Sequence, residues 1–422
     1  MKVAIIGYGG RGHIYAHYFQ EDERVQIVAV CDKKPKKLEE ALADIRGLKK
    51  ENAYLIDEEF FAQGKLADLL VVSTQDADHF GHAMKALEVG YDLLLEKPIS
   101  DSLERCLAIY QRAKELGRKV FICHVLRYAP FFEEIKRELD TGKYGKISTI
   151  NLTENVGFWH QAHSYVRGNW SVTEKSTPMI LAKCCHDLDI ISWLMGDNAC
   201  KAVSSFGSLD FFTADNAPEN SAEYCFACKN DECPYNSVKF YRTRAGMFHR
   251  VCENTPANAT PEEVEQALSD KTNPYARCVF HADNTAVDHQ VVNMVFANRA
   301  TAHLTMTAFA KDSYREIHVH CTHGDIRGDM LSGKLECNFY SLQNGGTGET
   351  KIIDLKKLSD GDYSHGGGDA RLVRDVIRVY MGEAGKGLTT IENSFISHSI
   401  GYAAEQSRLQ GGAVMKVEPL SK

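Results

Sequence analysis

Two side chains of this sequence have the types and positions expected for proton transfer on a small molecule. The first is Lys97, which follows the apolar run 92–95 and Glu96 and is fixed by Pro98. A lysine at the carboxyl end of a buried strand faces the edge where a doubly wound sheet binds its ligand. Desolvation there favours the neutral amine and suits it to proton transfer or to polarising a hydroxyl. The alternative is a lysine that only pairs with Glu96.

The second is His186, which lies in a helical pattern over 178–194. One face of that pattern carries Lys183, His186, Ile190 and Trp193. The spacing of three brings Lys183 and His186 together. An imidazole is the usual base for taking a hydroxyl proton while hydride leaves the same carbon, because its pKa lies near the working pH. The alternative is a histidine packed in a domain interface.

A glycine pattern near the N-terminus indicates the hydride acceptor. Residues 7–12 read Gly-Tyr-Gly-Gly-Arg-Gly directly after the apolar run 3–6, which fits the dinucleotide-binding pattern at the end of a strand. A second apolar run, 25–30, ends in Cys31 and Asp32, and an acid there accepts the ribose hydroxyls. The same acid repels the 2′-phosphate of NADP, so NAD is the expected cofactor. NADP stays open because Lys33 and Lys34 follow directly.

The remaining apolar runs predict two domains of different sheet type. Runs at 68–74, 92–95 and 119–125 are separated by helical patterns, which predicts an α/β Rossmann domain with a doubly wound parallel sheet over residues 1–125. Alternation of apolar and polar residues at 304–308 and 317–321 predicts a C-terminal α+β domain with a large, mostly antiparallel sheet over 126–422. Two domains also fit the length of 422 residues.

The motif Glu96-Lys97-Pro98 resembles the hallmark of the Gfo/Idh/MocA oxidoreductases. Three further stretches match: residues 74–79 resemble the family's loop beside the nicotinamide, residues 127–130 its entry to the second domain, and residues 186–194 its His-x-x-Asp-x-x-x-Trp-Leu helix. The resemblance is strongest over residues 1–200. It implies an NAD-dependent enzyme that oxidises a secondary hydroxyl of a sugar, a sugar derivative or a cyclitol, with Lys97 beside the reacting carbon.

Two other functions stay open beside that one. Some relatives keep their NAD and act as glycosidases through transient oxidation and elimination. A regulator that binds NAD without turnover is the third interpretation. The sequence also departs from the family, because Ala182 stands four residues before His186 where many members carry an aspartate. A Lys183–His186 pair would replace the Asp-His pair, with Asp187 or Asp189 orienting the imidazole.

The candidate residues fall into three groups. The expected catalytic residues are Lys97, His186 and Lys183. The expected cofactor residues are Gly7, Gly9, Gly10, Arg11, Gly12, Asp32, Thr74, His79, Glu96 and Lys97. The expected substrate residues are Arg127, His160, His163, Tyr165, Arg167 and His365. Most of the last group lie in the run 159–170, whose mixture of rings and polar groups is typical of carbohydrate sites. Incidental loop polarity, and for His365 a helix start capped by Asp369, are the alternatives.

A cysteine-rich insertion near 221–280 predicts a structural zinc. It contains C-x2-C-x4-C at Cys225, Cys228 and Cys233, and a closed zinc site needs a fourth ligand. Cys278 is the expected fourth ligand, ahead of Cys252 and His249. Free thiols are the alternative.

Charge, apolar runs and cysteine content indicate which binding partners and which cellular compartment to expect. The net charge is −8 and neither a basic tail nor aromatic-basic interleaving is present, which argues against nucleic acid. The apolar runs are too short to span a bilayer, so no membrane partner is expected. Met1 leads directly into a strand without a leader pattern, and many of the 13 cysteines lie in apolar segments. We therefore expect a cytoplasmic protein, and the large sheet predicts a homodimer or homotetramer.

Overall fold

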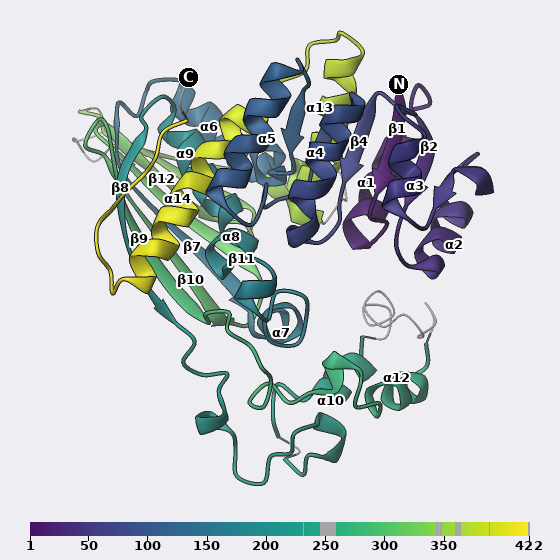
Figure 1. Cartoon of the computed structure of the whole chain (residues 1–422). Helices are drawn as coiled ribbons and strands as arrows, with labels where there is room; N and C mark the ends of the chain where they lie inside the picture. The colour runs from purple at the N-terminus through teal and green to yellow at the C-terminus, as the bar shows by residue number, and fades with distance from the viewer. Residues whose placement is uncertain are drawn as a thin grey trace.

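The first half of the chain forms a parallel sheet covered by helices (Figure 1). The structure, a computed structural model, describes residues 1–230, 232–244, 259–342, 346, 348–358, 364–387 and 389–420. Six strands are ordered β3-β2-β1-β4-β5-β6 and every pairing is parallel. The strands are β1 (Lys2–Ile6), β2 (Gln26–Cys31), β3 (Ala53–Tyr54), β4 (Leu69–Val72), β5 (Asp92–Leu95) and β6 (Val120–Ile122). This order is that of a dinucleotide-binding Rossmann sheet, which confirms the predicted fold class.

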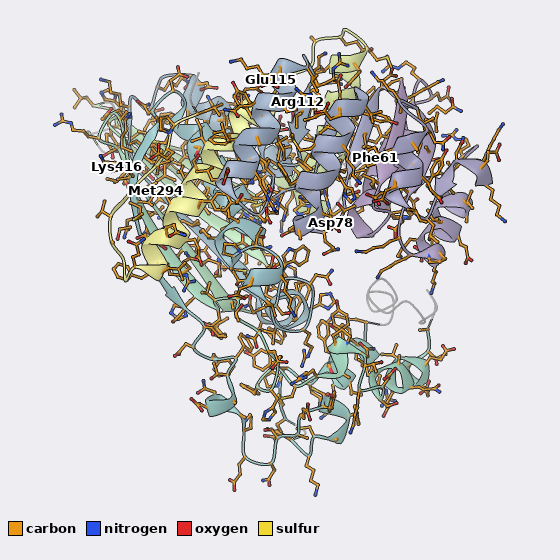
Figure 2. All side chains as sticks on the ribbon, viewed as in Figure 1. Phe61, Asp78, Arg112, Glu115, Met294 and Lys416 are labelled. Carbon is orange, nitrogen blue, oxygen red and sulfur yellow. The ribbon has the colours of Figure 1, made fainter. Side chains whose placement is uncertain are left out.

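The helices of this domain bury one face and expose the other. They are α1 (Gly10–Gln20), α2 (Pro35–Asp44), α3 (Asp57–Ala62), α4 (His79–Val89) and α5 (Leu103–Glu115). In α5 the side chain of Ser102 accepts a hydrogen bond from the Arg105 backbone and begins the helix. Cys106 and Ile109 pack inward, whereas Arg112 and Glu115 lie on the outer face, where Figure 2 labels them. The apolar stripe of α5 therefore faces the sheet.

The second half forms a nine-stranded sheet in the order β14-β13-β12-β11-β7-β10-β9-β8-β15. Only the β7–β10 pairing is parallel among the described strands. The strands are β7 (Ile147–Gly157), β8 (Cys200–Ser208), β9 (His289–Phe296), β10 (Thr301–Ala310), β11 (Tyr314–Cys321), β12 (Gly324–Asp329), β13 (Lys334–Phe339), β14 (Glu349–Asp354) and β15 (Met415–Lys416). Alternate residues of β10, such as Leu304 and Met306, enter the core. The prediction of a mixed, mostly antiparallel sheet is confirmed.

The helix expected over 178–194 is two helices, and the break lies between the two predicted catalytic residues. Helix α8 (Met179–Ala182) ends before Lys183, and α9 (Cys185–Met195) begins after Cys184. In a continuous helix the carbonyl of Ala182 would accept from the backbone N–H of His186. It accepts instead from Lys97 Nζ at 2.8 Å. The continuous-helix prediction is therefore wrong, and at the break the carbonyl of Ala182 is bonded to a side chain from the first domain.

Two C-terminal helices return to the first domain. Helix α13 (Gly368–Tyr380) places Leu372 and Val376 in the same apolar cluster as β1 and α1. Helix α14 (Ile391–Leu409) places Phe395 against the other face of the parallel sheet. The backbone N–H of Ile122 in β6 donates to the carbonyl of Thr389 at 2.7 Å. The C-terminal segment thus completes the packing of the N-terminal sheet. No described helix is long and apolar enough to cross a membrane.

A buried ion pair fixes the domain junction. Arg127 lies in the short helix Val125–Tyr128 that follows β6, and its Nε and Nη2 each donate to a different oxygen of Asp189 at 2.6 Å. Both side chains are almost fully buried, and His124 Nδ1 lies 2.7 Å from the same carboxylate. Burial alone would raise the pKa of Asp189, but Arg127 and then His124 outweigh burial and lower it to about 2. The carboxylate is therefore ionised at neutral pH.

We expect Asp189→Asn to destabilise the protein strongly. It leaves the Arg127 guanidinium buried without its counter-charge, which costs about 3–5 kcal/mol in the free energy of unfolding. The matched control is Glu336→Gln, which removes a carboxylate from the more exposed pair with Arg327 and should cost about 1 kcal/mol or less. Urea unfolding of both variants measures the difference. Equal losses in the two variants would contradict this role for Asp189.

Candidate active site

The glycine loop after β1 has the shape that a dinucleotide needs. Gly7 has φ +89°, and a Cβ there would lie 2.6 Å from the carbonyl oxygen of Ser73. A Cβ on Gly12 would lie 2.1 Å from the carbonyl oxygen of Gly7. Gly9 and Gly10, in contrast, face open space. The loop is therefore tight toward the protein and open on the side where a pyrophosphate approaches the backbone.

Asp32 stands beside that loop at the end of β2. Its carboxylate accepts from the backbone N–H of Tyr8 at 2.6 Å and from that of Lys34 at 2.9 Å. Asp32 is half-buried, whereas Lys33 and Lys34 are exposed, and Lys33 Nζ lies 3.8 Å from Asp78. Loop and acid together fit an adenosine dinucleotide whose ribose hydroxyls reach Asp32.

Arg11 ties the glycine loop to β5 and to the C-terminal segment. Its Nε donates to Glu96 at 2.6 Å and its Nη2 donates to Asp369 at 2.5 Å. Tyr15 also donates to Glu96, at 2.5 Å. Burial alone would raise the pKa of Glu96, but Arg11 first and Lys97 second outweigh it and hold the pKa below its usual value. Asp369 and Tyr15 were missed as site residues, because their sequence positions carry no sign of this contact.

The loop after β4 is held between the two domains. The ring of His79 lies between two backbone carbonyls, with Nδ1 2.8 Å from Pro98 O and Nε2 3.2 Å from Thr74 O. Asp76 accepts from Trp170 Nε1 at 2.9 Å and from Thr177 Oγ1 at 2.6 Å. His79 is therefore oriented by the backbone of this loop, which sits next to the Lys97 turn. Asp76 was not among the predicted residues.

His186 is buried, and no ion pair joins it to another of the residues that the structure describes. Its side chain forms ring contacts with His124 and with His365, each with centroids 5.8 Å apart. Within the described part of the chain, its Nδ1 has no hydrogen-bond partner. Burial first, and then Lys97 and His365, hold the pKa of His186 well below its usual value. His186 is therefore neutral at pH 7 and able to accept a proton.

An Asp-His pair is present, but not on α9. His365 Nδ1 lies 2.8 Å from Asp369 Oδ2, at the spacing of four residues that is missing around His186. His365 has φ +47°, and Gly366 and Gly367 also have positive φ. Burial lowers the pKa of His365, although Asp369 opposes that shift. Asp369 thus holds His365 against His186, and it does not cap the helix, because the N-cap of α13 is Gly367 and no side chain bonds to the cap.

Lys183 turns away from α9 toward the second sheet. Its Nζ lies 3.3 Å from Glu154 Oε1, a fully buried carboxylate on β7. The other oxygen of Glu154 lies 2.6 Å from Arg315 Nη2, and Arg315 Nε donates to Asp187 at 2.6 Å. Burial raises the pKa of Asp187, although Arg315 opposes that shift. Glu154 and Arg315 were missed, since both lie on strands whose pairing the sequence does not reveal.

The carboxylates expected to orient His186 are engaged elsewhere. Asp187 binds Arg315, and Asp189 binds Arg127 and His124. The predicted Lys183–His186 pairing is replaced by two separate arrangements, Lys183 with Glu154 and His186 with His365. The helix break at Lys183 causes this difference, because it removes the regular spacing on which the pairing rests.

Two of the remaining predicted substrate residues lie near these groups. His160 is half-buried at the end of β7, with its Nδ1 3.2 Å from Ser164 Oγ and its ring 5.6 Å from that of Tyr165. Burial lowers the pKa of His160 well below its usual value, and Lys183, Lys97 and His365 add to that shift. These interactions place His160 in the same electrostatic environment as the candidate catalytic residues.

Three other predicted substrate residues contact protein groups instead. Arg127 is paired with Asp189 at the domain junction. The ring of His163 stacks on that of Tyr275, with centroids 5.0 Å apart, and its Nδ1 is hydrogen-bonded to Tyr241. Arg167 donates to the carbonyls of Arg277 and Tyr235 and to Cys225 Sγ. His163 and Arg167 therefore join the strand end after β7 to the cysteine-rich insertion.

The four predicted metal ligands gather around one cavity. Cys225, Cys228, Cys233 and Cys278 all line it, and the described cysteines are free thiols. Within the described ranges, however, no three His, Cys, Asp or Glu side chains are already arranged to hold a metal ion. The alternative ligands Cys252 and His249 lie outside the described residues.

Comparison with known families agrees with this architecture. Residues 1–124 match the model of the oxidoreductase family's NAD-binding Rossmann fold, and residues 136–417 match the model of the family's C-terminal alpha/beta domain. The chain belongs to the Gfo/Idh/MocA oxidoreductase family. The resemblance inferred from the Glu-Lys-Pro motif is thereby confirmed.

Individual relatives are distant. The chain is 26% identical over 175 residues to the putative oxidoreductase YteT of Bacillus subtilis, covering 40% of each chain. It is 28% identical over 199 residues to an inositol 2-dehydrogenase/D-chiro-inositol 3-dehydrogenase of Lactiplantibacillus plantarum, covering 47% of this chain and 53% of that one. A levoglucosan dehydrogenase solved with NADH and levoglucosan has a TM-score of 0.71 at 15% identity, covering 99% of both chains. The chain thus spans about half or less of these curated relatives, and the structural match is a likeness of fold.

We expect Asp32→Ala to weaken NAD binding by about 10- to 100-fold, because a hydrogen bond to a charged group contributes about 1.5–3 kcal/mol. The affinity for NADP should fall less, since the same change removes the repulsion between Asp32 and the 2′-phosphate. Calorimetric titration with both dinucleotides measures the two effects. The control is Glu104→Ala, an exposed acid on α5 of the same domain, which should bind both as the unaltered protein does. An Asp32→Ala protein with unchanged affinity for NAD would rule out contact between Asp32 and the ribose.

Proposed function

We propose that this protein is an NAD-dependent oxidoreductase that oxidises a secondary hydroxyl of a sugar, a sugar derivative or a cyclitol. The observation that carries the proposal is that Lys97 bonds to the backbone of the segment leading to His186, whose ring contacts that of His365. Lys97 leaves the carboxyl end of β5 and reaches Ala182 beside His186, and the His186 ring contacts that of His365. These groups lie next to the dinucleotide loop, to which Arg11 links His365 through Asp369.

The residues divide the proton transfer between them. Bound NAD would supply the hydride acceptor for the C–H bond of the alcohol carbon. Lys97 would donate a hydrogen bond to the alcohol oxygen and favour the developing negative charge there. His186, neutral because of burial and its cationic neighbours, would take the hydroxyl proton as the carbonyl forms. The hydrogen bond from Lys97 Nζ to the Ala182 carbonyl keeps this group in place before a substrate arrives.

The substrate class follows from the groups around this centre. His160 and Lys183 offer polar contacts to hydroxyls, and the buried ring of Tyr165 lies against His160. Rings beside hydrogen-bonding groups suit the mixed polar and apolar faces of a sugar or cyclitol. The similar proteins include an inositol dehydrogenase and a levoglucosan dehydrogenase, whose names agree with that class.

A second activity is supported by the pair of imidazoles. Redox-neutral glycoside cleavage through transient oxidation needs one base for the hydroxyl proton and another for the neighbouring C–H proton. His186 and His365 lie in ring contact, and Asp369 is positioned to stabilise a protonated His365. An NAD-dependent glycosidase is therefore the alternative to the dehydrogenase.

The expected assembly is a homodimer or homotetramer formed through the outer face of the second sheet. Val295 on β9 is 39% exposed and Ile352 on β14 is 59% exposed, and both point away from the core. A broad sheet face with exposed aliphatic groups is suited to pairing with its copy.

The deciding experiment follows NADH absorbance and aglycone release while the protein is offered a panel of free sugars, cyclitols and aryl glycosides. Net NADH formation on a free sugar or cyclitol supports the dehydrogenase, whereas aglycone release without added NAD supports the glycosidase. Lys97→Ala should lower kcat on the substrate found by at least about 100-fold. The control Lys114→Ala, an exposed lysine on α5, should leave kcat unchanged. Full turnover by Lys97→Ala would end the proposal.

The pH dependence should identify His186 as the base. A base whose pKa is held down stays unprotonated to lower pH, so activity falls only when the pH drops below the ordinary histidine pKa of about 6.5. We expect the acidic limb of kcat/KM to lie below that value. The His365→Asn protein should be slower but should show the same acidic limb of kcat/KM. The His186→Asn protein should show no such limb. A limb at or above the ordinary histidine value would contradict the neutral state assigned to His186.

A further inference from the structure

The cysteine-rich insertion brings four thiols together from two separate stretches of chain. Cys225, Cys228 and Cys233 belong to one stretch and Cys278 to another, and all four line the same cavity. A short antiparallel bridge between Tyr224 and Arg277 holds the two stretches side by side. The backbone N–H of Cys278 also donates to the carbonyl of Glu223 at 2.9 Å. The thiols therefore converge because of a defined backbone pairing.

The surroundings of the cavity favour a metal with soft ligands. Among the described residues that line it, none is a carboxylate, and the apolar side chains include Pro218, Val279 and Phe280. The buried guanidinium of Arg167 donates to Cys225 Sγ at 3.5 Å, which stabilises a thiolate there. Four sulfur donors in a cavity without a carboxylate suit zinc better than the oxygen-preferring Mg²⁺ and Ca²⁺.

The described part of the insertion has no large core of its own. In Figure 1 it extends below the second sheet as a lobe containing α10 (Ser237–Arg242) and α12 (Pro261–Leu268). Its described apolar residues enter two small clusters, one where Cys278 packs with residues outside the insertion such as Phe212 and Ala308, and one around Tyr241 and Leu268. Small lobes with so little buried apolar surface commonly need a disulfide or a metal to fix their fold. The described cysteines form no disulfide.

We propose that Cys225, Cys228, Cys233 and Cys278 bind one structural Zn²⁺. The thiols are not yet set at coordinating positions within the described chain, so binding requires them to turn about χ1 between staggered rotamers. Each ligand loses its proton as the metal binds, so binding releases protons and weakens at acid pH. Four protein ligands close the tetrahedron, so the ion fixes the lobe against Arg167 and performs no chemistry on the substrate.

The test uses the full chain purified from zinc-containing medium. Elemental analysis should find about one zinc per chain, and X-ray absorption at the zinc edge should find four sulfur neighbours at about 2.3 Å. Cys225→Ser and Cys278→Ser should each lose most of the bound zinc. The control Cys321→Ser alters a buried cysteine of β11 outside the cavity and should keep it.

A measurement on the unaltered protein covers the case in which the variants fail to fold. Titration with a mercurial reagent, in the presence of a coloured zinc chelator, should release the metal in step with the modification of four thiols. Substoichiometric zinc, nitrogen or oxygen neighbours in the absorption spectrum, or a disulfide among these four cysteines would each overturn the proposal. Because none of these readouts measures turnover, the zinc site and the proposed dehydrogenase can fail independently.

Discussion

The hydrogen bond from Lys97 Nζ to the carbonyl of Ala182 connects the chemistry of one domain to the backbone of the other. It lies at the break between two helices, where α8 ends at Ala182 and α9 begins again at Cys185. The break turns Lys183 toward Glu154 and leaves His186 in contact with His365. The arrangement of the candidate site therefore depends on one ammonium group that is anchored before any ligand binds.

The buried charges around the site are compensated in separate groups. Arg11 pairs with Glu96 and Asp369. Arg127 donates two hydrogen bonds to Asp189. Arg315 pairs with Glu154 and Asp187. Each acid near the histidines thus has an arginine partner, which offsets the cost of burying both. His186 receives no carboxylate from these groups, and burial first, then Lys97 and His365, lower its pKa. The distribution of partners places His365 on a carboxylate, but burial lowers the pKa of this imidazole as well.

Sequence patterns predicted the parts of the site that are local in the chain. The glycine loop with Asp32 and the Glu96-Lys97-Pro98 turn follow directly from strand ends, and the structure places them where those patterns indicate. Glu154, Arg315 and Asp369 were missed because their roles arise from pairing between distant strands and from the return of α13. The Lys183–His186 pairing was wrong because the helix breaks at Lys183 and Cys184, which helical spacing in the sequence does not reveal.

The return of α13 and α14 also bears on how the chain folds during synthesis. The strands of the parallel sheet lie in the first part of the sequence. Leu372, Val376 and Phe395, from the last part, cover its two faces. Until more than 390 residues have left the ribosome, those faces expose aliphatic surface to the solvent. The cofactor-binding half therefore depends on the end of the chain, and a nascent chain lacking that end is the form most exposed to aggregation and to chaperone capture.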